Sequence, residues 1–432
     1  MGGISMLRRY SLLSYKDFNI VASPKPRRKL TYRITGAAAI ERITPLLQQI
    51  PEVMFVEAPA DAENIDFVFE TTCEKSVKKV HESAIWYSRL LGSSVLENKD
   101  AFGALCKKMT FPTLDSALVQ GEQLEEHFRS IYTLDGSNTN NQSSKKESND
   151  RWFMLKSSRG NCGQGIYVIN PSNFETVLSK LNVLERAQHF LVQEYVRYPA
   201  LYKGRKFHLR CYAMLTGGFQ GYLHTNAFLL SASQPYDPNN DETLTQLTNL
   251  SVNKQWDEHP GQLPVHLPSH FPSQYTQLCA FLSELFEVAL PYMSVQTAAT
   301  HYEMLGIDVM IDHNPALERE EQGRIYVCEV NRLPGLSSAK QNKAFEDVFY
   351  NDMLREMVRV LLAIEQEETN EEEVENGIEQ KHAQLSEQHP ECDEIGHEWR
   401  VQGMGCWEKN VCFPTFQPTR ERCEEHHRCN IL

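Results

Sequence analysis

The chain has 432 residues, of which 41% are hydrophobic and 23% carry a charge. This balance is typical of a globular protein with a sizeable core, and the length allows about two to four domains. Lysine and arginine total 43 against 57 aspartates and glutamates, a net charge of −14, which argues against a general nucleic-acid-binding protein. No apolar run reaches the ~18 residues of a membrane-spanning helix. Eleven cysteines in so long a chain do not make a disulfide scaffold, so we expect a cytoplasmic protein.

The N-terminal part of the chain begins with a basic stretch. Residues 1–28 hold one acid, Asp17, and predict a flexible basic leader, with a transit peptide as the less favoured alternative. Alternating apolar residues then predict strands, and residues 29–95 are expected to form an N-terminal α/β lobe. The elements expected in this lobe are strands at 29–36, 52–58 and 65–70 and a helix at 81–91.

The next segment, 96–200, predicts a central lobe built around a hairpin with a glycine-rich turn. Residues 136–150 contain no large apolar side chain and predict a disordered insertion. Ser172 and Glu175 have the spacing of a capping box, which predicts the start of a helix. The other elements expected in this lobe are a helix at 97–108 and strands at 152–156, 165–169 and 190–196.

Residues 201–364 predict a C-terminal lobe, and two more segments follow it. The stretch 365–379 holds eight glutamates, so 365–391 is expected to be an acidic linker or a solvated extension of the preceding helix. Residues 392–432 form a tail that contains five of the eleven cysteines. The elements expected in the lobe are strands at 208–215, 220–224, 307–311 and 325–330 and helices at 274–289 and 341–364.

The turn SRGNCGQG in the central hairpin combines flexibility with nearby positive charge. Gly160, Gly163 and Gly165 allow backbone N–H groups to approach phosphate oxygens closely. The turn is not a Walker loop, because no Gly-Lys-Ser/Thr follows, and it is not a dinucleotide fingerprint, because it opens no helix. With Lys156 just before it, the turn predicts a lid over a triphosphate, although a plain hairpin turn has the same pattern.

Two neighbouring strands of the C-terminal lobe bring oxygen ligands together. In IYVCEVN, Glu329 and Asn331 are two residues apart and therefore point to one face of the strand. Asp308 in GIDVMID lies on the adjacent predicted strand and can share that face. Two carboxylates and an amide oxygen are hard ligands that suit Mg²⁺, which takes its remaining ligands from water and phosphate. The alternative is an acidic hairpin that faces solvent, and the apolar neighbours disfavour it.

The segment KGRKFHLR predicts a strand with one cationic face. Lys206, His208 and Arg210 alternate onto one side of this strand, while Phe207 and Leu209 take the other. A cationic face suits an anionic nucleotide together with an anionic substrate. Taken alone, the pattern is typical of a solvated surface.

Taken together, these segments resemble the tubulin tyrosine ligase-like family, a branch of the ATP-grasp ligases. The resemblance covers roughly residues 85–362 and implies an α/β (α+β) ATP-grasp fold. Such a fold has N-terminal, central and C-terminal lobes and holds the nucleotide between two β-sheets. The matching motifs are LENKD (96–100), KSSRGNCGQGI (156–166), VQEYV (192–196), KFHLR (206–210), SQPY (233–236), LTNLSVNK (247–254), GIDVMID (306–312) and EVNRLPG (329–335).

The resemblance also implies roles for individual residues. Arg210 is expected to face the acceptor and the reacting phosphoryl group, and Asn249 to lie near the triphosphate. The residues expected to contact phosphate are Lys99 and Lys156, and Gly163 and Gly165 are expected in the lid above the phosphates. The residues expected around adenine and in the nucleotide pocket are Gln193, Glu194, Tyr195, Val196, Lys206 and His208. The magnesium ligands expected are Asp308, Glu329 and Asn331.

The chemistry implied by the resemblance is ATP-dependent amide formation. ATP activates a carboxylate as an acylphosphate, and an amino group then displaces phosphate. The implied cofactors are ATP and Mg²⁺. The implied partners are a free amino acid and the tail of tubulin or another protein, with no nucleic acid, in the cytoplasm or on microtubules. A small-molecule ATP-grasp ligase is the less favoured reading, because the combination of K-F-x-x-R with L-T-N points to the tubulin branch.

Three departures from the family pattern bear on activity. Where the family usually carries aspartate within K-F-x-x-R, this chain has His208, and where it carries arginine before S-x-P-Y, this chain has Leu230. His224 and Thr225 replace a tyrosine–arginine pair. Losing a cation from a phosphate contact can cost several kcal/mol in a transition state. The alternative function is therefore a pseudo-ligase that binds ATP and tubulin or microtubules with little or no turnover.

The C-terminal tail allows two interpretations of Cys429 besides an unmodified end. The ending Cys429-Asn430-Ile431-Leu432 matches a prenylation motif, and a single lipid without strong basic charge predicts at most weak membrane attachment. Alternatively the tail binds zinc, since it has enough ligands although no tight CxxC pair occurs. The residues available to zinc are Cys392, His397, Cys406, Cys412, Cys423, His426 and His427.

Overall fold

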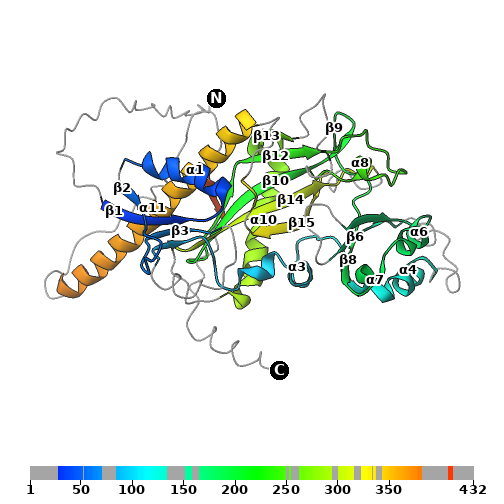
Figure 1. Cartoon of the computed structure of the whole chain (residues 1–432), viewed down its shortest axis with the longest axis horizontal. Helices are drawn as coiled ribbons and strands as arrows, with labels where there is room; N and C mark the ends of the chain where they lie inside the picture. Colours follow the sequence, from blue (N-terminus) through cyan, green and yellow to red (C-terminus); the bar gives the residue numbers. More distant parts are fainter. Residues whose placement is uncertain are drawn as a thin grey trace, which may run out of the picture.

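The structure is a computed structural model in which three β-sheets carry helices on their faces, a mixed α/β architecture (Figure 1). It describes residues 28–51, 53–70, 84–133, 151–157, 165–249, 253, 262–293, 300–315, 323–332, 334–336, 343–381 and 407–411. Several predictions fall outside these residues: the basic leader up to residue 27, the insertion at 136–150, Gly160 and Gly163, and most of the C-terminal tail. Across the described residues, no helix combines the length and apolarity needed to cross a membrane.

The N-terminal sheet is parallel and has the strand order β2-β1-β3-β4. Its first two strands are joined by helix α1, whose buried face packs toward the sheet, as expected of a βαβ unit. The elements are β1 (Arg28–Ile34), α1 (Ala37–Gln48), β2 (Val53–Glu57), β3 (Phe67–Phe69) and β4 (Trp86–Tyr87). The three strands predicted in this region are confirmed.

The helix predicted at 81–91 is wrong where the structure describes it. Trp86 and Tyr87 form strand β4, with Trp86 opposite Phe67 of β3. Their side chains pack into two different apolar clusters, as successive residues of a strand buried on both faces do. A short continuous apolar run has no period that separates such a strand from a buried helix.

The central sheet is antiparallel and has the order β5-β8-β6-β7. Its strands are β5 (Ser116–Gln120), β6 (Phe153–Ser157), β7 (Ile166–Ile169) and β8 (His189–Glu194). The helices η2 (Gly121–Gln123), α4 (Leu124–Thr133), α6 (Phe174–Ser179) and α7 (Val183–Arg186) accompany it. The predicted hairpin is confirmed as β6–β7, and Phe128 of α4 packs against it in an apolar core.

The capping box predicted from Ser172 and Glu175 is wrong, although a helix does follow. Helix α6 starts after Asn173, which makes no side-chain cap. Asn170 competes with the cap, because its side-chain oxygen accepts from the backbone N–H groups of Ser172 and Asn173, as asparagine does in turns. A capping box forms instead at the start of α7, between Asn182 and Glu185.

The large sheet is antiparallel and centres on the long strand β10. Strands β12 and β11 pair with one edge of β10, β14 pairs with the other, and β15 pairs with β14. Its strands are β9 (Leu201–Tyr202), β10 (Arg205–Thr216), β11 (Gly221–His224), β12 (Asn226–Ser231), β13 (Gln262–His266), β14 (Tyr302–Ile311), β15 (Ile325–Arg332) and β16 (Trp407–Val411). Strand β16 comes from the predicted tail and pairs with β11. The four strands predicted here are confirmed.

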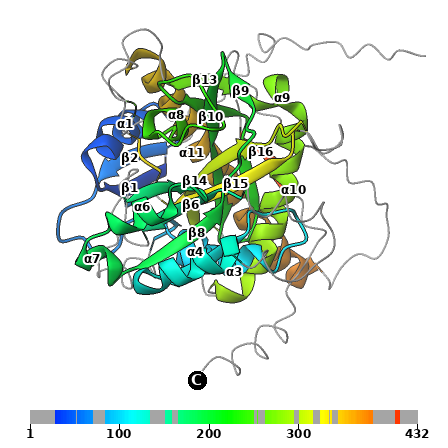
Figure 2. The same ribbon diagram turned by 90° about the vertical axis from the view of Figure 1, so that its right-hand side faces the viewer.

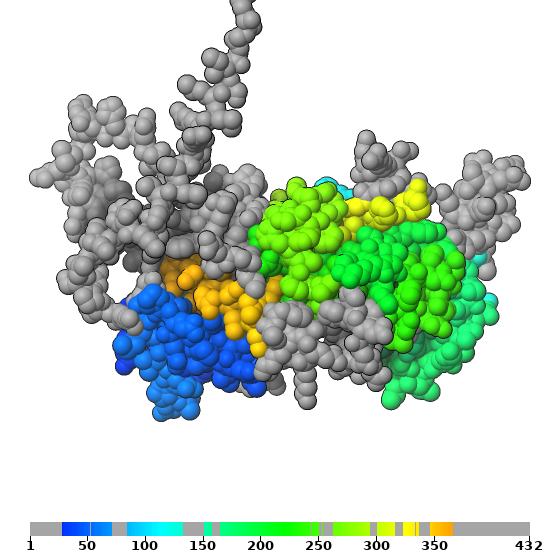
Figure 3. All heavy atoms as spheres, turned by 90° about the horizontal axis from the view of Figure 1, so that it is seen from above, coloured from blue at the N-terminus to red at the C-terminus, as the bar shows by residue number. Residues whose placement is uncertain are grey.

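Helices cover both faces of the large sheet. On one face lie η1 (Ser93–Leu96), α3 (Lys99–Cys106), α9 (Leu267–His270), α10 (Pro272–Ala289) and η4 (Leu290–Tyr292). On the other face lies α11 (Lys343–Lys381), which packs between this sheet and the N-terminal sheet (Figures 1 and 3). The helix α11 runs through most of the predicted acidic linker, as far as Lys381. Helix α8 (Thr243–Gln246) follows β12.

Candidate functional site

A pocket lies between the central sheet and the large sheet. Residues of β6, β7 and β8 line one side, and residues of β10, β14 and β15 line the other, with the loop after α8 at the edge. Figure 2 shows the ribbons of β6 and β8 next to those of β14 and β15. Most of the residues predicted for nucleotide binding line it. These are Lys156, Gln193, Glu194, Tyr195, Val196, Lys206, His208 and Asn249, together with Asp308 and Glu329 of the predicted metal site.

Apolar side chains from both walls line part of the pocket. Leu114, Val196 and Met310 form one small cluster, while Met154 packs in another with Tyr195. The pocket also contains Ile166 and Leu247, which were not predicted. An apolar slot with a few placed polar groups is the usual form of a small-molecule site.

Two lysines approach the pocket from the side of the glycine-rich turn. Lys156 is buried at the end of β6, and its Nζ donates to Gln193 Oε1 at 2.8 Å. Lys99, at the start of α3, donates from Nζ to the backbone oxygen of Ser157 at 2.9 Å. Burial lowers the pKa of Lys99, the negative charge of Glu329 counteracts this, and Lys156 lowers it further. Lys99 therefore lies within electrostatic reach of the pocket without lining it.

Lys206 extends from the opposite wall and is 4% exposed. Its Nζ donates to Tyr195 Oη at 2.6 Å and lies 3.9 Å from the centroid of that ring. Burial is the main reason that the pKa of Lys206 falls to about 7. A weakly charged amine in contact with an aromatic ring is poised to become cationic when an anion enters the pocket.

Replacing Lys206 by methionine should stabilise the protein most at low pH. The pKa of Lys206 is about 7 in the folded chain and about 10.4 when unfolded. Between these values the unfolded chain binds more protons, so stability rises with pH, and below pH 7 folding carries the full cost of the buried charge. Lys206→Met should therefore raise the melting temperature more at pH 6 than at pH 9. Thermal unfolding at both pH values tests this, with the exposed Lys180→Met as control; an equal shift at both would contradict it.

The large sheet aligns three charged residues across three strands. Arg210 of β10 stands opposite Asp308 of β14, which stands opposite Glu329 of β15. The guanidinium of Arg210 holds both oxygens of Asp308, through Nε to Oδ1 and through Nη2 to Oδ2 at 2.9 Å. Burial alone would raise the pKa of Asp308, but Arg210 and His208 outweigh it and hold that pKa well below its ordinary value.

Gly306 makes room for this arginine. A Cβ atom at this position would lie 2.9 Å from Pro334 Cβ and 3.4 Å from Arg210 Nη1. Any larger residue would therefore press on the guanidinium that binds Asp308. The glycine of GIDVMID thus has a physical reason to precede the aspartate by two residues.

The predicted magnesium ligands lie together, although they form no closed cage. Asp308 and Glu329 face each other, and Asn331 donates from Nδ2 to Glu329 Oε1 at 3.1 Å. Within the described ranges, no three His, Cys, Asp or Glu side chains converge closely enough to hold a metal ion by themselves. Mg²⁺ commonly uses one or two carboxylates and completes its shell with water and phosphate. The carboxylate pair fits such an open site.

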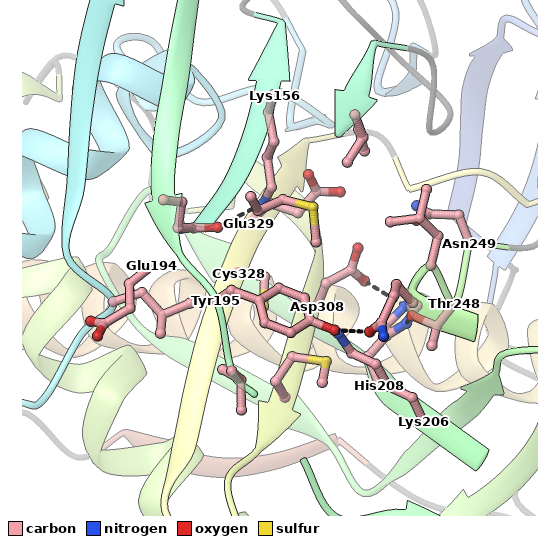
Figure 4. Close-up of a pocket in the computed structure, with 18 residues that line it drawn as sticks. Lys156, Glu194, Tyr195, Lys206, His208, Thr248, Asn249, Asp308, Cys328 and Glu329 are labelled. Carbon is pink, nitrogen blue, oxygen red and sulfur yellow. Dashed lines mark hydrogen bonds and ion pairs between the residues drawn. The ribbon is translucent and has the colours of Figure 1, made fainter. Parts of the chain in front are cut away.

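His208 lies between Asp308 and the loop after α8 (Figure 4). Its Nδ1 lies 2.6 Å from Thr248 Oγ1, and its Nε2 lies 3.5 Å from Asp308 Oδ1. Sequence reasoning missed two residues that line the pocket, Thr248 and Cys328. The only sequence signal for Thr248 was its place next to the predicted Asn249. The irregularity of β15 next to Glu329 turns Cys328 into the pocket, and no sequence pattern signals such a bulge.

Several predicted site residues lie outside the pocket lining. Arg210 and Asn331 stand behind it, in contact with Asp308 and Glu329 respectively. Gly165 lies at the end of the turn with φ of 67°, a conformation that favours glycine. Gly163 lies outside the described residues.

The remaining departures lie within the protein core. Leu230 of β12 stands opposite His208 and packs into the cluster shared with α11. His224 and Thr225 are buried as well. None of these three lines the pocket. An arginine at position 230 would therefore place a charge in an apolar cluster, at considerable cost.

Comparison with known proteins identifies the family of this chain. The model of the tubulin-tyrosine ligase family matches residues 105–370. This chain belongs to the tubulin-tyrosine ligase family. The family segment spans the central sheet, most of the large sheet and much of α11, and so contains both walls of the pocket.

The curated relatives match this chain over part of their own length. Tubulin polyglutamylase TTLL7 of Homo sapiens is 25% identical over 244 residues, covering 54% of this chain and 26% of that protein. A probable tubulin–tyrosine ligase of Schizosaccharomyces pombe is 22% identical over 265 residues, covering 53% of this chain and 62% of that one. Tubulin monoglutamylase TTLL4 of Mus musculus is 25% identical over 213 residues, covering 43% and 17%. The chain thus spans less than two thirds of each of these relatives.

Proposed function

We propose that this family member is an ATP-dependent carboxylate–amine ligase that joins an amino acid to the tail of a protein, with tubulin as the acceptor. The names of its relatives support the acceptor, because they include tubulin polyglutamylases, a tubulin monoglutamylase and a probable tubulin–tyrosine ligase. These names also support glutamate or tyrosine as the amino acid.

The observation that carries the proposal is the opposition of charges across one pocket. Lys156 on the central sheet faces Asp308 and Glu329 on the large sheet, with Lys206 beside them (Figure 4). An apolar slot next to these groups suits a purine, and the lysines suit its phosphates. The carboxylates suit a divalent cation that accompanies the phosphates.

Each group has a distinct task in this reaction. The slot between Met154 and Met310 orients the base, and Lys156 holds the phosphates close to the carboxylate that is activated. The cation supplies positive charge to the phosphates when it is bound by Asp308 and Glu329, with Asn331 next to them. Arg210 can stabilise negative charge on the acylphosphate once it exchanges part of its contact with Asp308.

A second candidate function is a pseudo-ligase that binds ATP and tubulin without turnover. The observation in its favour is the contact between Arg210 and Asp308, which pairs the proposed catalytic arginine with a proposed metal ligand. The apolar burial of Leu230 adds to it, because no cation is supplied from that position.

Transfer of labelled amino acid to tubulin separates the two candidates. The purified full chain is incubated with tubulin, ATP, a divalent cation and labelled glutamate, tyrosine or glycine in turn. Incorporation that depends on ATP supports the ligase. Tight ATP binding without incorporation of any of the three supports the pseudo-ligase, and absence of ATP binding contradicts both.

Substituting Lys156 by alanine should weaken nucleotide binding about 10- to 100-fold. Lys156 Nζ, which donates to Gln193 in this structure, is expected to contact phosphate when the nucleotide binds. A charge-assisted contact of this kind contributes about 1.5–3 kcal/mol. Titration with a fluorescent ATP analogue measures the dissociation constant. Lys107→Ala, an exposed lysine at the end of α3, is the matched control. An unchanged constant for Lys156→Ala would place this lysine outside the nucleotide site.

A further inference from the structure

His208 is a buried imidazole of which only one ring nitrogen makes a short polar contact. It is 6% exposed. Its Nδ1 contacts the hydroxyl of Thr248 at 2.6 Å. Its Nε2 is buried and lies 3.5 Å from Asp308 Oδ1, within reach of an ion pair but too far for a well-formed hydrogen bond. A ring held at one nitrogen while the other faces a carboxylate needs an explanation, because buried polar atoms are nearly always satisfied.

This is the arrangement of a metal-binding histidine. Such a histidine donates one ring N–H to a neighbouring acceptor, which fixes the tautomer and leaves the other nitrogen as ligand. Here Nδ1–H can donate to Thr248 Oγ1, so that the lone pair of Nε2 faces Asp308. Metal–ligand bonds of about 2.0–2.2 Å place two neighbouring ligand atoms about 3 Å or slightly more apart. The separation of 3.5 Å between Nε2 and Oδ1 therefore leaves room for an ion that touches both.

The contact between Arg210 and Asp308 does not close this position. A carboxylate offers about four lone-pair positions, and the guanidinium uses one on each oxygen of Asp308. Each oxygen of Asp308 therefore keeps a second lone pair, and Oδ1 is the oxygen that lies 3.5 Å from His208 Nε2. Glu329 stands opposite Asp308 on β15 and lines the same pocket.

We propose that His208 is a metal ligand of this chain and that the site accordingly prefers a divalent transition-metal ion such as Mn²⁺ over Mg²⁺. The inference rests on the proposed function, because the remaining ligands are phosphate oxygens of the nucleotide. Histidine at this position offers a nitrogen ligand beside the carboxylates, whereas Mg²⁺ favours oxygen ligands alone. First-row transition metals accept imidazole readily, and Mn²⁺ also accepts carboxylate and water.

Electron paramagnetic resonance of Mn²⁺ tests this on the full chain, with any histidine tag removed. The protein is mixed with Mn²⁺ and β,γ-methylene ATP, whose phosphate bridge contains no nitrogen. Pulsed measurements detect nitrogen bound directly to Mn²⁺. Competition with Mg²⁺ gives the ratio of the two affinities. His208→Asp is the test variant, and the exposed His270→Asn on α9 is the control.

We expect nitrogen coupling in the parent and in His270→Asn, and its loss in His208→Asp together with at least a tenfold fall in the preference for Mn²⁺ over Mg²⁺. Nucleotide-dependent Mn²⁺ binding without nitrogen coupling, or with coupling that survives in His208→Asp, would overturn the role of His208 and leave the proposed function standing. Failure of Mn²⁺ and Mg²⁺ alike to bind with the nucleotide would overturn both.

Discussion

Replacing Glu329 by glutamine is expected to lower ligation at least 100-fold while the protein keeps its fold. Glutamine has the shape of glutamate and can still accept the hydrogen bond that Asn331 now donates to Glu329 Oε1. It lacks the charge that a divalent cation requires, and charge stabilisation at the phosphates is a large part of the catalysis of phosphoryl transfer. Amino-acid transfer to tubulin and thermal unfolding measure the two effects.

The same variant is informative if the parent protein does not turn over. Nucleotide binding should then lose its dependence on the divalent cation, because one of the two facing carboxylates is gone. Glu57→Gln, at the end of β2 in the N-terminal sheet, controls for the change of charge. Ligation at the parental rate by Glu329→Gln would show that the carboxylate pair is not the metal site.

Replacing Arg210 by methionine should destabilise the protein by about 3–5 kcal/mol and abolish ligation. The substitution leaves the buried carboxylate of Asp308 without the guanidinium that holds both of its oxygens, and an uncompensated buried charge has a cost of this size. Chemical denaturation measures the loss of stability.

The double variant Arg210→Met/Asp308→Asn distinguishes a charge effect from a packing effect. It removes both charges, so most of the lost stability should return, with a coupling energy of at least about 2 kcal/mol. Ligation should stay absent, because the arginine and a metal ligand are both missing. The single variant Asp308→Asn completes the comparison. If the stability losses of the two single variants simply add up to that of the double variant, the contact between Arg210 and Asp308 contributes little and the cost lies in packing.

The strands of the large sheet were predictable because their patterns are long and regular. In β10 the predicted alternation of the KFHLR side chains is confirmed. Phe207 and Leu209 pack in the core against α10, while Lys206 and His208 face the pocket. The strand β4 was not predictable, because two buried aromatic residues carry no period. The capping box failed because Asn170, two residues upstream of Ser172, offered the backbone a competing turn.

The candidate site was predictable as a set of residues but not as a set of contacts. The spacing of Glu329 and Asn331 correctly placed them together, and the strand pairing put Asp308 opposite Glu329. That Arg210 holds Asp308, and that Thr248 fixes the ring of His208, depends on register and on a loop. These are tertiary contacts, and local sequence patterns do not encode them.

The position of α11 has a consequence for the order in which the chain can fold during synthesis. The N-terminal sheet is synthesised before α11, yet the apolar cluster against that sheet includes Phe349, Met353 and Leu361 of α11. In a nascent chain, Leu30 and Trp86 therefore lack these partners until α11 has emerged. Exposed apolar surface of this kind is prone to aggregation, so we expect the protein to need more protection during translation than a chain whose first sheet completes its own core.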